Sequence, residues 1–209
     1  MKKLLLISVA LLAFMSASAQ ENPGGKKLQN YIQFGAGAFT EAGYGFWEVN
    51  PGAVLRMSYG LDIMLDDKWS VMPGLGSIIQ MGPVTAFYSD GGDPDGMCMA
   101  DVFCVARYHF QSGDGINTIV GIGPQVSFMT LKDKYFVDAD PWEPISGKPK
   151  FKDWDIGLQP SVVFLTRKHF HWGFEANFGL RNMRIQYPEY NRTGHTHFID
   201  LMVTCGWHF

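Results

Sequence analysis

Apolar and polar residues alternate strictly between His197 and Phe209. One set of alternate positions holds Ile199, Leu201, Val203, Cys205, Trp207 and Phe209, and the other holds Phe198, Asp200, Met202, Thr204, Gly206 and His208. Successive side chains of a β-strand point to opposite faces, so the pattern predicts a strand with one strongly apolar face. An apolar strand of this kind suggests a sheet that faces lipid and closes on itself.

The same two-residue period recurs in seven earlier segments, which have an apolar face opposite a face of Gly, Ser, Gln and charged residues. These segments lie near residues 28–39, 55–65, 69–81, 98–110, 120–128, 154–164 and 172–181. With the terminal strand they predict about eight strands, each near the ~9–11 residues that a tilted transmembrane strand needs. The fold class is therefore predicted to be all-β.

The connections between these segments alternate in length. Short ones are expected at 66–68, 111–116 and 166–170, and long ones at 40–52, 83–96, 130–152 and 183–196. Outer-membrane barrels combine short periplasmic turns with longer extracellular loops. The alternation predicts an antiparallel up-and-down transmembrane β-barrel of about eight strands, with both mature termini in the periplasm.

Alternation alone does not decide which face meets lipid. A soluble exported lipocalin-like barrel would bury its apolar face, and Gly45-x-Trp47 weakly resembles the short signature of that family. The membrane arrangement is favoured because the polar face lacks the Lys and Glu typical of a soluble surface. It is also favoured by aromatic residues on the apolar face near strand ends, as in interfacial girdles: Tyr59, Trp69, Tyr108, Phe110, Trp154, Trp172, Trp207 and Phe209.

The start of the sequence has the layout of a secretory signal peptide. Lys2 and Lys3 precede an apolar run over 4–14, and Ala17-Ser18-Ala19 forms a small-x-small cleavage site. We expect a signal peptide over 1–19 and one outer-membrane barrel domain over 20–209; a transmembrane anchor is the alternative for the first segment. The chain is 14% aromatic and 18% charged, and its net charge of -3 comes without a basic block, which argues against a nucleic-acid partner. The three cysteines, Cys98, Cys104 and Cys205, are expected to be reduced residues on the apolar face.

Several segments resemble the PorT-like outer-membrane β-barrel proteins, a porin-type family. Tyr59-Gly60-Leu61 to Gly82, with Trp69-Ser70-Val71-Met72-Pro73-Gly74-Leu75, is similar to the second and third strands of that family. Asp101-Val102 to Arg107-Tyr108-His109-Phe110 resembles the fourth strand of the family, although Phe103 stands where the family often has proline in that strand. Asp155-Ile156-Gly157-Leu158 resembles the sixth strand. The closing Gly206-Trp207-His208-Phe209 resembles the terminus that the barrel assembly machinery recognises. The resemblance covers roughly 28–209 and implies no catalytic residues.

The polar face carries charges of both signs, at Arg56, Asp62, Asp101, Arg107, Asp155, Glu175, Arg181 and Asp200. The interior of an eight-stranded barrel is just wide enough for side chains to fill. We therefore expect a plugged polar interior in which the three arginines pair with carboxylates, because unpaired buried charge is costly. An ion or proton path is the alternative interpretation.

Two histidine pairs and one acidic loop could bind metal. His169-x-His171 and His195-x-His197 have the i, i+2 spacing that places side chains on one face of a strand, but titratable residues at the membrane interface are the favoured interpretation. The loop Ser89–Gly96 gathers Asp90, Asp93 and Asp95 without the register of a calcium loop. We predict no metal, cofactor or catalytic residues.

An enzyme would need a nucleophile beside a base. Ser77 lies on the apolar parity of a strand, but no histidine is placed to reach it and G-x-S-x-G is absent. Aromatics in the segments 44–47, 86–88 and 135–142 could either bind partners or pack over the barrel mouth. We expect a non-enzymatic outer-membrane protein with a structural or interaction role, whose partners are outer-membrane lipid, the assembly machinery and an envelope protein. A lipid-modifying enzyme and a soluble ligand-binding barrel are the alternatives.

Overall fold

The computed structural model describes residues 28–43, 52–83, 96–110, 117–131, 136–137, 144–145, 151–166, 169–183, 185 and 195–209. Eight strands of ten to sixteen residues form one sheet. They are β1 (Leu28–Gly43), β2 (Gly52–Met64), β3 (Trp69–Pro83), β4 (Gly96–Phe110), β5 (Asn117–Leu131), β8 (Trp154–Leu165), β9 (Phe170–Gly179) and β10 (Thr196–His208). A separate short pair is formed by β6 (Phe136–Val137) and β7 (Pro144–Ile145). The described residues contain no helix long and apolar enough to cross a membrane.

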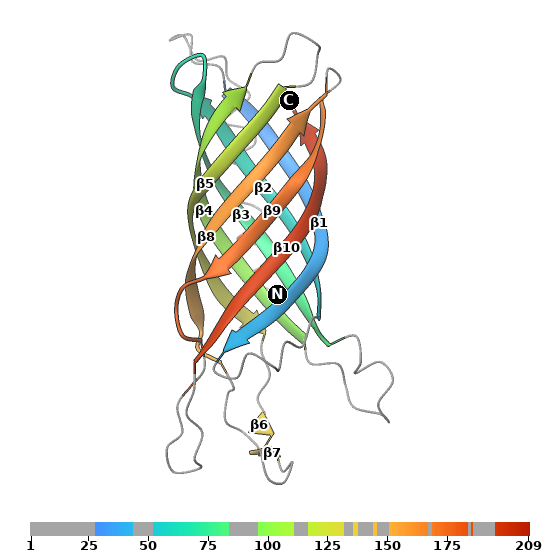
Figure 1. The fold of residues 1–209 in the computed structure, drawn as a ribbon, viewed down its shortest axis with the longest axis vertical. Helices are drawn as coiled ribbons and strands as arrows, with labels where there is room; N and C mark the ends of the chain where they lie inside the picture. The colour runs from blue at the N-terminus through green and yellow to red at the C-terminus, as the bar shows by residue number, and fades with distance from the viewer. Residues whose placement is uncertain are drawn as a thin grey trace, which may run out of the picture.

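The sheet closes into a barrel in the order β1-β10-β9-β8-β5-β4-β3-β2, with every neighbouring pair antiparallel (Figure 1). Neighbouring strands of the barrel follow one another in the sequence, apart from β1 and β10, which pair to close the barrel. Between β5 and β8 the chain contains the separate β6–β7 pair, which is not part of the barrel. The predicted eight-stranded, antiparallel up-and-down barrel is therefore confirmed.

The two ends of the barrel differ, as the connection lengths predict. Short turns follow β2, β4 and β8 at the end where β1 begins and β10 finishes; we call this the short-turn end. The opposite end, where the longer connections leave β1, β3, β5 and β9, is the long-connection end (Figure 1). The predicted signal peptide over 1–19, the acidic residues of the 89–96 loop and the aromatic segments 44–47 and 86–88 lie outside the described residues, as does most of 135–142.

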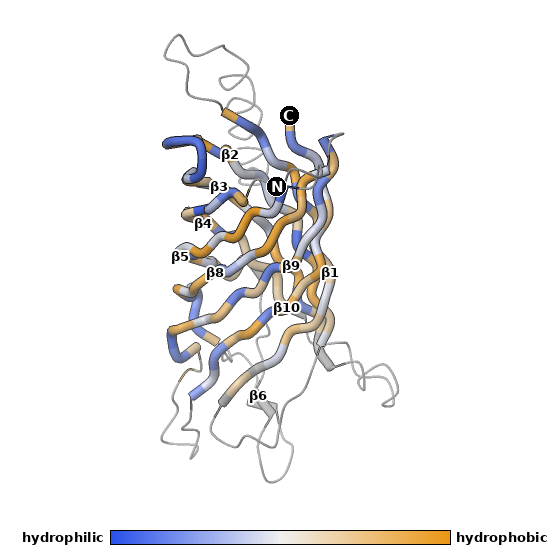
Figure 2. Tube along the Cα trace, turned by 45° about the horizontal axis from the view of Figure 1, so that its top comes forward, coloured by the Kyte–Doolittle hydropathy of each residue, from blue (hydrophilic) through white to orange (hydrophobic). Residues whose placement is uncertain are grey.

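Large apolar side chains are exposed on the outside of the barrel. Figure 2 shows apolar and polar residues alternating along the strands. Met57 and Leu201 are each 57% exposed, whereas the polar residues at intervening positions are buried. This polarity is the reverse of the soluble lipocalin-like alternative, which would bury its apolar face. An exposed apolar surface of this extent is typical of a face that contacts a membrane or another protein.

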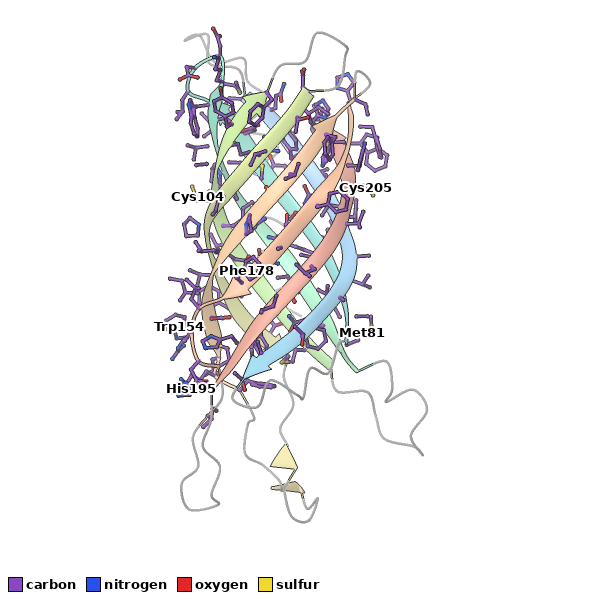
Figure 3. All side chains as sticks on the ribbon, in the orientation of Figure 1. Met81, Cys104, Trp154, Phe178, His195 and Cys205 are labelled. Carbon is purple, nitrogen blue, oxygen red and sulfur yellow. The ribbon has the colours of Figure 1, made fainter. Side chains whose placement is uncertain are left out.

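Aromatic side chains gather on the outer surface near both ends. At the short-turn end Trp69 packs edge-on against Tyr108 at a centroid distance of 5.0 Å, and Phe164 stacks on Trp172 at 4.5 Å. Trp154 lies at the long-connection end (Figure 3). Tyr59 pairs in register with Ile32 and Leu75 of the apolar face, but the residue is only 8% exposed and its hydroxyl donates to Asn30 Oδ1 at 2.5 Å.

Candidate functional site

The interior of the barrel is the candidate site, since the charged residues that the sequence singled out converge there. At mid-height the Arg56 guanidinium donates to both Asp101 and Glu175, which reach it from β4 and β9. Glu175 Oε2 also accepts a hydrogen bond from Gln33 Nε2 at 2.9 Å. We call Arg56, Asp101 and Glu175 the central ion cluster; all three are buried.

A second ion cluster lies nearer the short-turn end. Arg107 Nη1 is 3.0 Å from Asp62 Oδ2, and its guanidinium lies over the ring of Tyr31 at 4.5 Å. His109 Nε2 is 3.8 Å from the same Asp62 oxygen. The two clusters fulfil the expected pairing for two of the three arginines.

The third arginine contradicts the prediction. Arg181 lies at the long-connection end, where its guanidinium donates to the Trp154 carbonyl at 2.9 Å and covers the Trp154 ring at 3.8 Å. Its backbone N–H, rather than its guanidinium, donates to Asp155 Oδ1. Arg181 follows the end of β9, so its side chain is free to turn toward the rim instead of into the barrel.

Glycines on the inner wall make room for these large side chains. Gly76 faces Asp101 across the β3–β4 pair, and a Cβ on Gly76 would collide with the Asp101 carboxylate. Gly74 faces Phe103 in the same way, and the Phe103 ring lies 5.0 Å from the Arg56 guanidinium. Large side chains thus pack closely against the inner wall at these positions, in agreement with the predicted plugged interior.

The histidines of the two i, i+2 pairs lie in different surroundings. His169 has a positive φ of 62° in the turn before β9, and its Nδ1–H donates to the His208 carbonyl at 3.0 Å. His171 points inward and is fully buried, 5.1 Å from the ring of Tyr31 and 6.0 Å from that of His208. His195 is exposed at the long-connection end (Figure 3). No group of three or more His, Cys, Asp or Glu side chains suited to a metal ion occurs in the described part of the chain.

Two serines could be considered as nucleophiles. Ser77 is exposed on the outer face, where its register partners are Met57 on β2 and Ala100 on β4, neither of which is a base. Ser70 was not singled out by its sequence pattern, yet its Oγ lies 2.7 Å from His109 Nε2. Asp62 approaches that same nitrogen, whereas a catalytic triad needs the acid on the other ring nitrogen.

Ser70 is also 1% exposed inside the barrel, so a substrate could not reach it. The Ser70–His109–Asp62 contact is therefore part of the polar packing at the short-turn end. The three cysteines are free, and Cys104 and Cys205 point away from the barrel (Figure 3).

The turn between β2 and β3 has its own local electrostatics. Asp66 Oδ1 accepts hydrogen bonds from the backbone N–H groups of Lys68 at 2.7 Å and Trp69 at 2.8 Å. These two bonds favour the ionised carboxylate and lower the pKa of Asp66 below its ordinary value of 3.8. An Asp that accepts backbone bonds two and three residues ahead is a common way to fix a tight turn.

Solved structures with the same fold are outer-membrane barrels. Neisserial surface protein A (NspA) is matched with a TM-score of 0.52 and 11% identity over 86% of this chain and 97% of that one. The outer-membrane enzyme PagL is matched with a TM-score of 0.51 and 12% identity over 85% and 98%. Ail, the attachment invasion locus protein of Yersinia pestis, is matched with a TM-score of 0.50 and 9% identity over 87% and 98%.

No family model and no curated protein matches the sequence. At this level of identity the likeness shows the fold alone, and the three structures include an enzyme. The chain has the fold of the eight-stranded outer-membrane β-barrels.

Proposed function

We propose that this protein is an outer-membrane barrel without catalytic activity, which works through contacts made at its long-connection end or with another envelope component. The observation that carries the proposal is the polarity of the closed barrel. Ionised side chains cross-link the walls from the inside, as Arg56 does between β4 and β9, while the apolar side chains face outward. Such a barrel is a rigid frame for its connections.

The proposal places the short-turn end in the periplasm and the long connections outside the cell. It retains membership of the PorT-like family, secretion by the signal peptide over 1–19, and insertion by the assembly machinery through β10. Ail is named the attachment invasion locus protein, and that name supports an adhesive role for a barrel of this fold.

Location is tested by cell fractionation followed by gel electrophoresis with and without boiling. We expect the chain in the outer-membrane fraction, with a folded form of different mobility that boiling converts to the unfolded form. Recovery from the soluble periplasm would overturn the membrane assignment.

The interaction role is tested by labelling intact cells with a membrane-impermeant amine reagent and by chemical cross-linking in the envelope. Lys132, Lys134, Lys148 and Lys150 of the β5–β8 connection should be labelled on intact cells. A cross-linked envelope protein recovered from the wild type, and lost when this connection is shortened, would support the proposal. Labelling that requires permeabilised cells would reverse the orientation.

A lipid-modifying enzyme is the second candidate, since PagL shares the fold. It is tested by incubating the purified barrel with outer-membrane lipid and following acyl-chain release or transfer. Turnover that is lost in Ser77→Ala, or in Ser70→Ala, would replace the non-catalytic proposal; no turnover would leave it standing.

A further inference from the structure

A small internal cavity of about 20 Å³ lies in the half of the barrel nearer the long-connection end. Its polar lining comes from five strands: Gln80 of β3, Gln125 and Ser127 of β5, Asp155 of β8, Asn177 of β9 and Asp200 of β10. We call these six residues the oxygen-lined cavity. A space of this size accommodates one particle the size of a water molecule.

The amide nitrogens around this cavity are already used in hydrogen bonds. Gln80 Nε2 donates to Asp200 Oδ1 at 2.6 Å, Asn177 Nδ2 donates to Asp200 Oδ2 at 3.4 Å, and Gln125 Nε2 donates to Ser127 Oγ at 3.0 Å. The three amide oxygens are left buried without a partner. Gln80 is 0%, Gln125 4% and Asn177 6% exposed, so solvent at the surface does not satisfy them.

The two carboxyl groups of the cavity differ from the other carboxyl groups of the interior, which form ion pairs with arginine. Asp62, Asp101 and Glu175 are each paired with an arginine elsewhere in the interior. Within the described ranges, neither Asp155 nor Asp200 forms an ion pair. The cavity is therefore rich in acceptors, and its two carboxyl groups are not held in ion pairs.

We propose that the oxygen-lined cavity binds one calcium-like divalent cation. Hard divalent cations are held by carboxylate and amide oxygens, and two carboxylates would match a charge of two. Among the described residues, no His or Cys lines the cavity, so its ligand chemistry does not favour zinc or copper. Besides Ser127, two of the oxygen-bearing residues are carboxylates (Asp155 and Asp200) and three are amides with an unpartnered oxygen (Gln80, Gln125 and Asn177). One bound cation could contact oxygens of both kinds.

An apolar cluster covers this site on the side of the long connections. Phe198 lines the cavity and packs edge-on against Phe151 at 5.1 Å, together with Met97 and Met183. All four residues of this apolar lid are buried. We therefore expect the cation to enter during folding and to exchange slowly afterwards. The inference is independent of the proposed adhesive role.

The test uses the full barrel purified from membranes in a non-ionic detergent. The protein is unfolded in urea with a chelator and refolded with or without calcium chloride, and bound calcium is counted after dialysis. We expect one calcium ion per chain and a higher urea midpoint in calcium, with a much smaller effect of magnesium, which requires stricter octahedral geometry. Absence of bound calcium together with an unchanged midpoint would overturn the proposal.

Variants locate the ion. Asp200→Asn and Gln125→Met should each weaken calcium binding at least about tenfold, the loss that corresponds to about 1.4 kcal/mol. Asp66→Asn, the same charge change in an exposed turn, should bind calcium as the wild type does. The Gln125 variant keeps the test decisive if the aspartate variant fails to fold.

A combined Asp90→Asn, Asp93→Asn and Asp95→Asn variant separates this site from the acidic loop. It should retain the calcium-dependent rise in the urea midpoint. If that variant loses the bound ion while Asp200→Asn and Gln125→Met keep it, the ion belongs to the loop and the interior site is wrong.

Discussion

Asn30 and Phe209 exchange two backbone hydrogen bonds, from Asn30 N to Phe209 O at 2.8 Å and from Phe209 N to Asn30 O at 3.0 Å. They extend the β1–β10 seam one residue beyond the Tyr31–His208 pair. Asn30 Nδ2 also donates to the Phe209 oxygen at 3.3 Å. The final residue of the sequence therefore helps to close the sheet.

Deleting Phe209 should lower the amount of inserted barrel, because the seam loses these bonds and an aromatic residue of the outer surface. The heat-modifiable fraction of membrane-extracted protein measures the effect. Phe209→Ala retains the backbone bonds and is the matched control. Equal insertion of the deletion and the wild type would show that neither contribution matters; a loss in both variants would assign the effect to the ring.

Arg56→Met should destabilise the barrel by about 3–5 kcal/mol, because Asp101 and Glu175 would remain buried without their cation. Urea unfolding in detergent or lipid measures the change. Adding Asp101→Asn and Glu175→Gln to the same chain removes the unpaired charges and should recover most of the loss. An Arg56→Met variant as stable as the wild type would show that the central ion cluster is not a stabilising brace.

Val203→Arg should cost about 2–4 kcal/mol, the depth-dependent cost of a cation on the lipid face of a barrel near the bilayer midplane. Val203 lies near the middle of β10 and is exposed on the outer surface. The unfolding free energy of the Val203→Arg variant in lipid vesicles is compared with that of Asp67→Arg, which places an arginine in an exposed turn. Equal stability of the two variants would contradict a lipid-facing position for Val203.

Asp66 should make the barrel less stable in acid. Its folded pKa lies below 3.8, so its stabilising contribution is fully present above that pH and is lost as the pH falls through the lower, folded value. Asp66→Asn retains an oxygen that can accept the bonds of the turn but does not titrate over this range. The difference in urea midpoint between wild type and variant should therefore shrink as the pH is lowered from 6 to about 3, a range set by the ordinary Asp pKa. A constant difference would show that the Asp66 carboxylate does not contribute through its charge.

Local sequence was sufficient for the strands and for most of the outward positions, because a period of two is a property of each segment alone. Tyr59 and Arg181 show the limit of that argument. The Tyr59 hydroxyl bonds Asn30 in the neighbouring strand, and Arg181 lies two residues beyond the end of β9. The alternation predicts on which face of the sheet a side chain lies, but not which groups the side chain contacts there.

The partners inside the barrel could not be read from the sequence. Arg56 meets Glu175 across 119 residues, and Gln80 meets Asp200 across 120. Such pairs follow from the stagger of the strands and the diameter of the closed barrel. The contact between Ser70 and His109 was missed for the same reason, since it joins β3 and β4 at a depth that only their register defines.

The charged inner face has a consequence for how the barrel enters a membrane. In the described part of the chain it buries five carboxylates, at Asp62, Asp101, Asp155, Glu175 and Asp200, and two arginines, at Arg56 and Arg107. An open sheet lying in hydrocarbon would expose these groups and its unpaired edges together. Closure of the barrel removes both costs, because it pairs the strand edges and takes the charged groups away from the hydrocarbon.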